Sequence, residues 1–198
     1  MPRVEPIELE VCDAAARDAL LGVRARLGMI PNLLLVMARS PTVLEGFLGL
    51  EGALERSVLP AKLREQIALA VAERNRSTYS VARHAAFGRA VGLSEEEIAD
   101  ARQGHSASGR RQAVLRFACA LVDKRGHLTD GDWTRLRTAG LGDREILDIV
   151  AAVCTALVSD YFAEAIRVES DFPEIGPEIG RPVTDVDWGH GARGGEEA

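Results

Sequence analysis

Apolar residues recur along this chain at three- and four-residue intervals, and no stretch alternates for long with the two-residue period of a strand. Leu20, Val23 and Leu27 form the first apolar stripe. Asp13 precedes this stripe as a helix N-cap, and Gly28 follows it as a stop. The same pattern continues down the chain, so the sequence predicts an all-α fold.

Prolines mark the starts of the next helices. Pro31, Pro41 and Pro60 each precede an apolar stretch, and proline is tolerated in the first helical turn. The helix after Pro60 is apolar on every side over residues 67–72, which predicts burial inside a bundle. Three glycines lie inside the helix after Pro41: Gly46, Gly49 and Gly52. Each is unfavourable by about 1 kcal/mol relative to alanine, so we expect another backbone to pack closely against them.

The most informative stretch covers residues 63–99 and predicts a buried helix, a polar break, a second helix and a glycine stop. If the second helix begins near Ser77, then Ser77, Ser80 and His84 share one face at i, i+3 and i+7. Glu65 lies on the helix before the break. The stretch therefore predicts that an acid, two hydroxyls and an imidazole converge.

Later stripes predict further helices over residues 94–102, 112–124, 130–137 and 144–168. Ser94 and Glu97 form a capping box at the start of the first of these. We interpret residues 1–172 as one helical domain. Residues 173–198 are rich in proline, glycine and acidic residues, which is typical of an extended or disordered tail.

Composition excludes several classes of function. The net charge is −6, and the basic residues are scattered rather than gathered in a stripe, so we expect no nucleic-acid partner. Cys12, Cys119 and Cys154 are at least 35 residues apart with no histidine at metal-ligand spacing, which predicts reduced thiols and no metal site. The N-terminus lacks a signal peptide's apolar core, and no apolar run approaches the roughly eighteen residues of a membrane span. We expect a cytoplasmic protein that does not enter a membrane.

In the helical segments described above, the chain resembles the carboxymuconolactone decarboxylase and alkylhydroperoxidase D-like (AhpD-like) superfamily. The resemblance covers about residues 28–173 and includes, in order, the segments IPNLLLVMARSP, LPAKLREQIALAVAERN, GLSEEEI and SDYFAEAIRVESDFP. It implies an AhpD-like helical bundle. It also implies a homo-oligomer, commonly a trimer or a hexamer, with pockets near the subunit contacts.

The chain departs from the superfamily's redox motif, which consists of a glutamate, a C-x-x-C pair and a histidine. Glu65 and His84 stand at the acid and histidine positions, whereas Ser77 and Ser80 stand where the redox branch has its cysteines. A thiolate is the nucleophile of that branch, and a serine hydroxyl forms no disulfide. The departure therefore argues against thiol peroxidase activity.

The resemblance to the non-redox branch implies decarboxylation of a small unsaturated lactone acid without a metal or an organic cofactor. Such a reaction needs a group that moves a proton at carbon and an environment that stabilises enolate-like charge. Imidazole titrates near neutral pH, so we predict that His84 is the acid/base. Glu65 either orients His84 or acts as the base itself. Tyr79 is predicted to donate a hydrogen bond to the substrate's oxyanion or carboxylate.

The same hypothesis assigns substrate-binding residues. Ser77 and Ser80 are predicted to contact the small-molecule substrate, and Arg83 or Arg76 to pair with its acid group. Ser77 is equally well explained as the N-cap of its helix.

Three functional hypotheses remain open: the acid/base enzyme, a peroxidase-like homologue that uses another thiol, and a non-catalytic ligand-binding or oligomeric module. His84 also has a purely structural interpretation as a satisfied core histidine. Asp160, Tyr161 and Glu164 late in the last helix are best interpreted as a solvated face.

Overall fold

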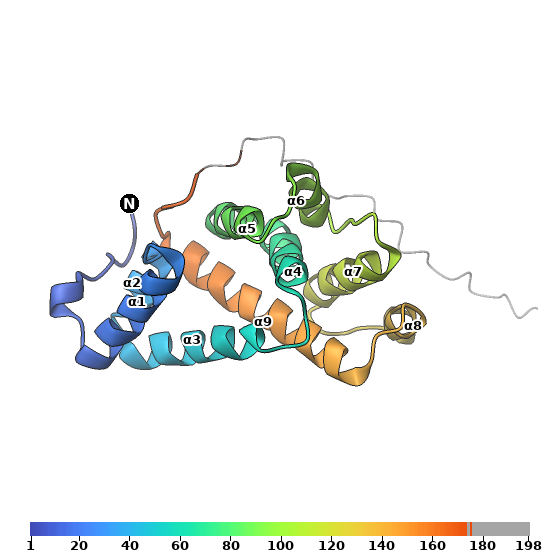
Figure 1. Ribbon diagram of the computed structural model, residues 1–198, viewed down its shortest axis with the longest axis horizontal. Helices are drawn as coiled ribbons and strands as arrows, with labels where there is room; N and C mark the ends of the chain where they lie inside the picture. The colour runs from blue at the N-terminus through green and yellow to red at the C-terminus, as the bar shows by residue number, and fades with distance from the viewer. Residues whose placement is uncertain (174, 176–198) are drawn as a thin grey trace, which may run out of the picture.

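The computed structural model describes residues 1–173 and residue 175, and within these residues it contains helices and no strand (Figure 1). A 3-10 turn at Leu9–Val11 precedes the α-helices. These are α1 Ala14–Leu27, α2 Asn32–Met37, α3 Pro41–Glu55, α4 Ala61–Arg74, α5 Thr78–Ala90, α6 Glu95–Arg102, α7 Gly109–Asp123, α8 Asp130–Thr138 and α9 Asp143–Ile166. The prediction of an all-α fold is confirmed. The predicted tail, apart from residues 173 and 175, lies outside the described residues.

Local capping explains where several helices begin and end. The Asp13 carboxylate accepts a hydrogen bond from the amide of Ala15, and Gly28 ends α1 with a φ of 77°. At α6, Ser94 and Glu97 form the predicted capping box. These ends follow the sequence closely because the capping groups are only a few residues from the backbone amides that they satisfy.

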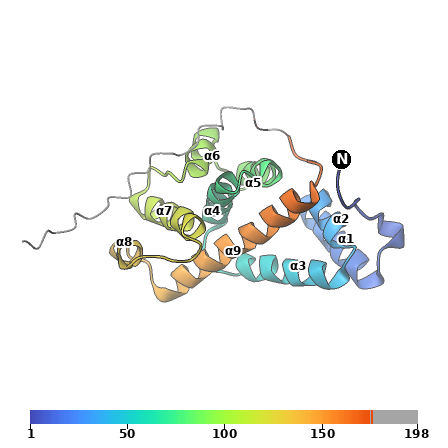
Figure 2. The same cartoon turned by 180° about the vertical axis from the view of Figure 1, so that it is seen from behind.

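Helix α4 lies at the centre of the fold, in contact with α5, α6, α7 and α9 (Figures 1 and 2). Residues 66–72 are all buried, as the apolar pattern predicts. One hydrophobic cluster joins α4 to α7 and α9, with Leu69, Leu115 and Ile149 fully buried in it. A second cluster joins α1, α2 and α3 to the start of α5. The cavity described below lies where these two parts of the core meet.

Helix α9 corrects one expectation drawn from the sequence. Its 24 residues have the length and apolarity of a membrane-spanning helix, with a mean hydropathy of 1.8 over the most apolar stretch. Half of that stretch is buried inside the protein, against helices that include α3, α4, α5 and α7. The apolar stretch of α9 is therefore longer than the sequence analysis expected. The burial of half of this stretch in the core explains much of its apolar character.

The glycines of α3 correct another expectation. A Cβ atom added at Gly46 or Gly49 would meet no heavy atom within 4 Å, and at Gly52 it would meet only the flexible end of Arg56 at 3.8 Å. No backbone within the described residues packs against them. Leu44 and Phe47 point into the core, and the glycines lie elsewhere around the helix.

The turn between α4 and α5 sets the geometry of the site. Arg76 adopts the left-handed conformation with a φ of 56°, and the amide of Ser77 donates to the carbonyl of Ala72 at 2.9 Å. A left-handed non-glycine residue costs about 1–2 kcal/mol, which packing must offset. The tight turn folds α5 back against α4.

Candidate functional site

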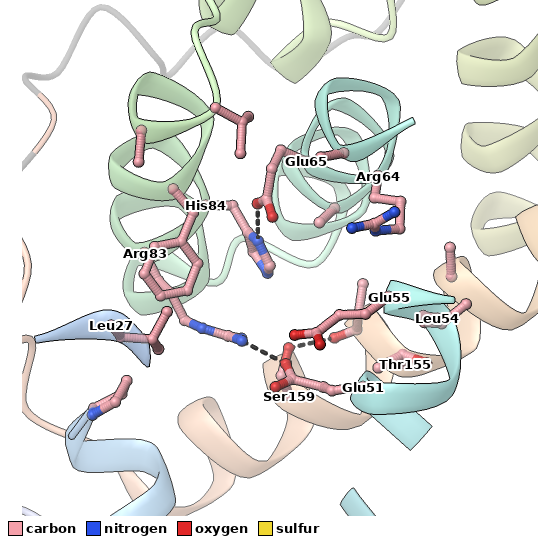
Figure 3. A pocket seen from close by; sticks show the side chains of 18 of the residues that line it. Leu27, Glu51, Leu54, Glu55, Arg64, Glu65, Arg83, His84, Thr155 and Ser159 are labelled. Atoms are coloured by element: carbon pink, nitrogen blue, oxygen red, sulfur yellow. Dashed lines mark hydrogen bonds and ion pairs between the residues drawn. The ribbon is translucent and has the colours of Figure 1, made fainter. Parts of the chain in front are cut away.

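A cavity of about 300 Å³ lies among α1, α2, α3, α4, α5 and α9 (Figure 3). Apolar side chains, including Leu34, Leu54 and Phe87, form much of its wall. The ionisable side chains that line it are Arg26, Glu51, Glu55, Arg64, Glu65, Arg83 and His84. A mostly apolar hollow with a few convergent polar groups is typical of a small-molecule site.

Glu65 and His84 form a hydrogen-bonded pair in this cavity. Oε2 of Glu65 on α4 lies 2.8 Å from Nδ1 of His84 on α5, and both side chains are mostly buried (Figure 3). A carboxylate only accepts, so we assign the Nδ1 proton to this bond. The other ring nitrogen, Nε2, is buried and has no hydrogen-bond partner among the described residues. The pair therefore leaves one imidazole nitrogen free for chemistry.

Arg83 supplies a fixed positive charge beside this pair. Its Nη2 donates to Oε1 of Glu51 at 2.5 Å (Figure 3). Its guanidinium lies 5.4 Å from the centre of the Phe87 ring. Burial alone would lower the pKa of Arg83, but the Glu51 carboxylate holds that pKa above its ordinary value. Nη1 is buried, and within the part of the chain that the structure describes it has no hydrogen-bond partner. Arg83 is thus a permanent cation with one donor group available.

Tyr79 does not line the cavity, in contrast to its predicted role. Its hydroxyl accepts a hydrogen bond from the amide of Leu33 at 3.2 Å, and its ring packs edge-on against Phe172. Burial raises the pKa of Tyr79, and the charge of Asp171 raises it further. Tyr79 belongs to the second hydrophobic cluster, so its contacts are those of a core residue.

Ser77 and Ser80 are also absent from the cavity wall. Both are fully buried, and neither hydroxyl has a well-aligned hydrogen-bond partner in residues 1–173 and 175. Ser77 occupies the N-cap position of α5, but its side chain makes no capping hydrogen bond. Arg76 likewise does not reach the cavity lining.

The late residues of α9 divide into two groups. Tyr161 is 64% exposed and Glu164 is exposed, in agreement with a solvated face. Asp160 is fully buried, so that interpretation is wrong for this residue. Asp160 follows Ile149, Val153 and Ala156 at i+11, i+7 and i+4, so it continues an apolar stripe of the helix, and that spacing was the available signal.

Glu51, the partner of Arg83, was not predicted from the sequence. Glu51 follows Leu44 and Phe47 at i+7 and i+4, so the three residues share one face of α3. That spacing was the available signal, because Leu44 and Phe47 are buried. At the side of the cavity, Glu55 pairs with Arg26 at 2.7 Å, and both side chains are about half exposed.

The cysteines lie away from the cavity. Cys12 and Cys119 are buried, Cys154 is exposed on α9, and none of the three lines the cavity. Among residues 1–173 and 175, no group of three or more histidine, cysteine, aspartate or glutamate side chains could hold a metal ion. The ionisable chemistry of this cavity therefore consists of carboxylates, arginines and one imidazole.

Comparison with solved structures defines the class of fold. The core of an uncharacterised peroxidase-related AhpD protein from Ralstonia eutropha JMP134 superposes with a TM-score of 0.79, at 24% identity over 86% of this chain and 92% of that chain. A peroxidase-related protein from Silicibacter sp. superposes with a TM-score of 0.74, at 22% identity over 83% and 91%. The fold is the AhpD-like helical fold, as the sequence predicts.

The debrominase Bmp8 shares this fold. A cysteine-to-alanine variant of it, in complex with 2,3,4-tribromopyrrole, superposes with a TM-score of 0.74, at 18% identity over 84% of this chain and 90% of that chain. No curated protein sequence matches this chain significantly. Residues 41–124, from α3 to the end of α7, match the carboxymuconolactone decarboxylase family, and the predicted resemblance is confirmed.

Proposed function

We propose that the protein is a cofactor-independent acid/base enzyme, a decarboxylase or isomerase-like lyase that acts on a small cyclic acid or lactone. The observation that carries the proposal is the Glu65–His84 hydrogen bond at a cavity wall, with Nε2 of the imidazole free. A carboxylate on Nδ1 fixes the imidazole orientation and stabilises the imidazolium that forms when Nε2 takes a proton.

Glu65, His84 and Arg83 suit the charge changes of such a reaction. When the carbon–carboxylate bond breaks, its electron pair passes into the conjugated lactone as an enolate and carbon dioxide leaves. The free Nη1 of Arg83 is available to donate to the enolate oxygen, where negative charge grows. The His84 imidazolium then gives its Nε2 proton to carbon. In an isomerisation, neutral His84 removes a proton from one carbon and returns it to another.

The peroxidase-like alternative has less support from this site. Peroxidase-related proteins share the fold, but no cysteine lines the cavity of this chain. A binding module needs only the cavity, and Bmp8 with its bound bromopyrrole shows that the fold accommodates a small ring. As the resemblance implies, we further propose a homo-oligomer, which exposed apolar side chains on α9 such as Leu147 and Val158 support.

The test is the ultraviolet decay of a panel of unsaturated lactone acids, including carboxymuconolactone. His84→Ala should lower kcat by at least about 100-fold, the lower end of what a positioned acid/base contributes. Glu65→Gln should lower kcat less, because the imidazole remains. The matched control is His105→Ala, which removes an exposed histidine that does not line the cavity and should leave turnover unchanged. Full activity in both site variants would refute the proposal.

A thiol-alkylating reagent separates this proposal from the peroxidase-like one. The acid/base enzyme should keep its turnover after alkylation, because its cysteines lie outside the cavity. If no lactone is turned over, and peroxide is reduced in a manner that alkylation abolishes, the thiol hypothesis replaces ours.

A further inference from the structure

Each carboxylate that lines the cavity already has a partner. The pairs are Glu51–Arg83, Glu55–Arg26 and Glu65–His84. The lining contains one more ionisable side chain, that of Arg64. Its Nη1 donates to the carbonyl of Leu59 at 2.7 Å, and within residues 1–173 and 175 it forms no ion pair. A guanidinium carries several N–H donors, so Arg64 keeps both its charge and donor groups available to a ligand.

The position of Arg64 on α4 directs it towards the cavity. Four residues of α4 line the cavity at the spacing i, i+3, i+4 and i+7, which places them on one helix face. They are Ala61, Arg64, Glu65 and Ala68. In the view of Figure 3, the His84 ring lies between the guanidinium groups of Arg64 and Arg83. A ligand bound against His84 is therefore exposed to positive charge from two helices, α4 and α5.

The stability of α4 does not explain a cation at this position. Arg64 is the fourth residue of the helix, and the first turn contains no acidic residue. The helix macrodipole places partial positive charge at the amino end, where a carboxylate is favoured over a guanidinium. Arg64 and the amino end of α4 thus produce potential of the same sign at one side of the cavity. A ligand carboxylate bound there would neutralise it.

We propose that Arg64 is the specificity-determining residue that binds a carboxylate of the substrate. This inference rests on the proposed acid/base function, and it assigns the substrate's acid group to a residue other than Arg83 or Arg76. One carboxylate suits the site better than a doubly charged phosphate. Three glutamates line the same cavity, and they would repel a second negative charge.

The two arginines of α4 and α5 then have separate roles. Arg83 is held by Glu51, and its Nη1 is available where negative charge develops in the proposed reaction. Arg64 binds a carboxylate that takes no part in the bond changes. That carboxylate has the same charge in the ground state and in the transition state, so Arg64 contributes to substrate binding and not to the rate of the chemical step.

A purely structural role for Arg64 is the competing explanation. In that role its hydrogen bond to Leu59 only anchors the segment that precedes α4. Arg64→Gln removes the charge but keeps an N–H donor, and Arg64→Lys keeps the charge. The matched control is Arg56→Gln. Nη1 of Arg56 also donates to a backbone carbonyl, that of Gly52 at 2.7 Å, but Arg56 does not line the cavity.

The first experiment needs no turnover. The ¹⁵N-labelled full chain is titrated by NMR with furan-2-carboxylate and with furan-2-carboxamide, which share a ring and differ by one negative charge. The wild type should bind the acid at least about tenfold more tightly than the amide, with shifts in α4 and α5, because a charge-assisted hydrogen bond contributes at least that much. Arg64→Gln should lose most of this preference, Arg64→Lys should keep part of it, and Arg56→Gln should keep all of it.

Three results of this titration overturn the proposal. They are equal affinity of the wild type for the acid and the amide, no binding of either, and a preference for the acid that survives in Arg64→Gln. The last result would assign the anion to Arg83 or His84 instead.

The second experiment uses any acid that the wild type turns over, together with its methyl ester. Arg64→Gln should raise KM for the acid about tenfold or more with kcat little changed, and it should leave KM for the ester as in wild type. A structural role would instead change the kinetics of acid and ester alike, and a fall in kcat at constant KM would contradict the proposal. Failure of the lactone panel would refute the proposed function, but the NMR titration would still decide whether Arg64 binds carboxylates.

Discussion

Replacement of Tyr79 by phenylalanine gives a direct test of whether this residue supports the fold or the chemistry. The variant keeps the ring that packs against Phe172 but removes the acceptor of the Leu33 amide and the polar neighbour of Asp171. A buried donor left without a partner costs about 1–3 kcal/mol. We therefore expect a loss of about 2 kcal/mol in the free energy of unfolding. For a chain of this size, that corresponds to a fall in Tm of about 4–8 °C.

Urea unfolding at pH 7, followed by far-ultraviolet circular dichroism, measures this loss. The chain offers a matched control in its other tyrosine, because Tyr161 is 64% exposed. Tyr161→Phe should stay within about 0.5 kcal/mol of wild type. Wild-type stability combined with lost turnover in Tyr79→Phe would refute our reasoning and restore Tyr79 to the catalytic role predicted from the sequence.

The pH dependence adds a second measurement on the same variant. Burial raises the pKa of Tyr79 in the folded protein above that of the unfolded chain, which is about 10. The folded state then binds the proton more tightly, so the stabilisation is complete below about pH 10 and is lost as the pH rises further. Tyr79→Phe should therefore make unfolding less sensitive to alkali than it is in wild type.

Two further predictions concern stability. Burial opposes ionisation of Asp132, but hydrogen bonds from Lys124 and Thr129 lower its pKa to about 2. This stabilisation is present above about pH 4 and disappears as the pH falls through 2. Asp132→Asn should therefore lower the free energy of unfolding in urea by about 2 kcal/mol at pH 7, and by progressively less in acid. A deficit that does not vary with pH would contradict this. Gly49→Ala should raise stability by about 0.5–1 kcal/mol in thermal melts, because α3 leaves open space there. A destabilised variant would instead indicate that another subunit packs on Gly49.

The parts of this structure that the sequence predicted are those encoded locally. The Asp13 cap, the Gly28 stop and the Ser94 capping box depend on atoms a few residues apart, and all three are present. The expectation for the α3 glycines was wrong because it concerned a partner backbone, and no sequence pattern supplies one. Local capping signals determine where a helix begins and ends, but they do not determine which helices pack against it.

The site residues show the same contrast between local features, which the sequence predicts, and long-range contacts, which it does not. Glu65 and His84 meet as predicted because one turn joins their helices, whereas Glu51 meets Arg83 across 32 residues and was missed. Tyr79 precedes His84 by five residues, and at 100° per residue it lies about 140° around α5 from the imidazole. Helical geometry alone therefore argued against a shared site for this pair. The burial of Asp160 depends on how α9 packs, which one unaligned sequence does not show.

The residues that line the cavity come from central and from peripheral helices, which affects how the cavity can change by mutation. The Glu65–His84 pair belongs to α4 and α5 at the centre of the core, while Arg26, Glu51 and Glu55 belong to the peripheral helices α1 and α3. Mutations in those outer helices can change the shape and charge of the wall without disturbing the pair. A library confined to α1 and α3 is therefore the natural starting point for changing which small molecules the cavity accepts, with the Glu65–His84 pair left in place.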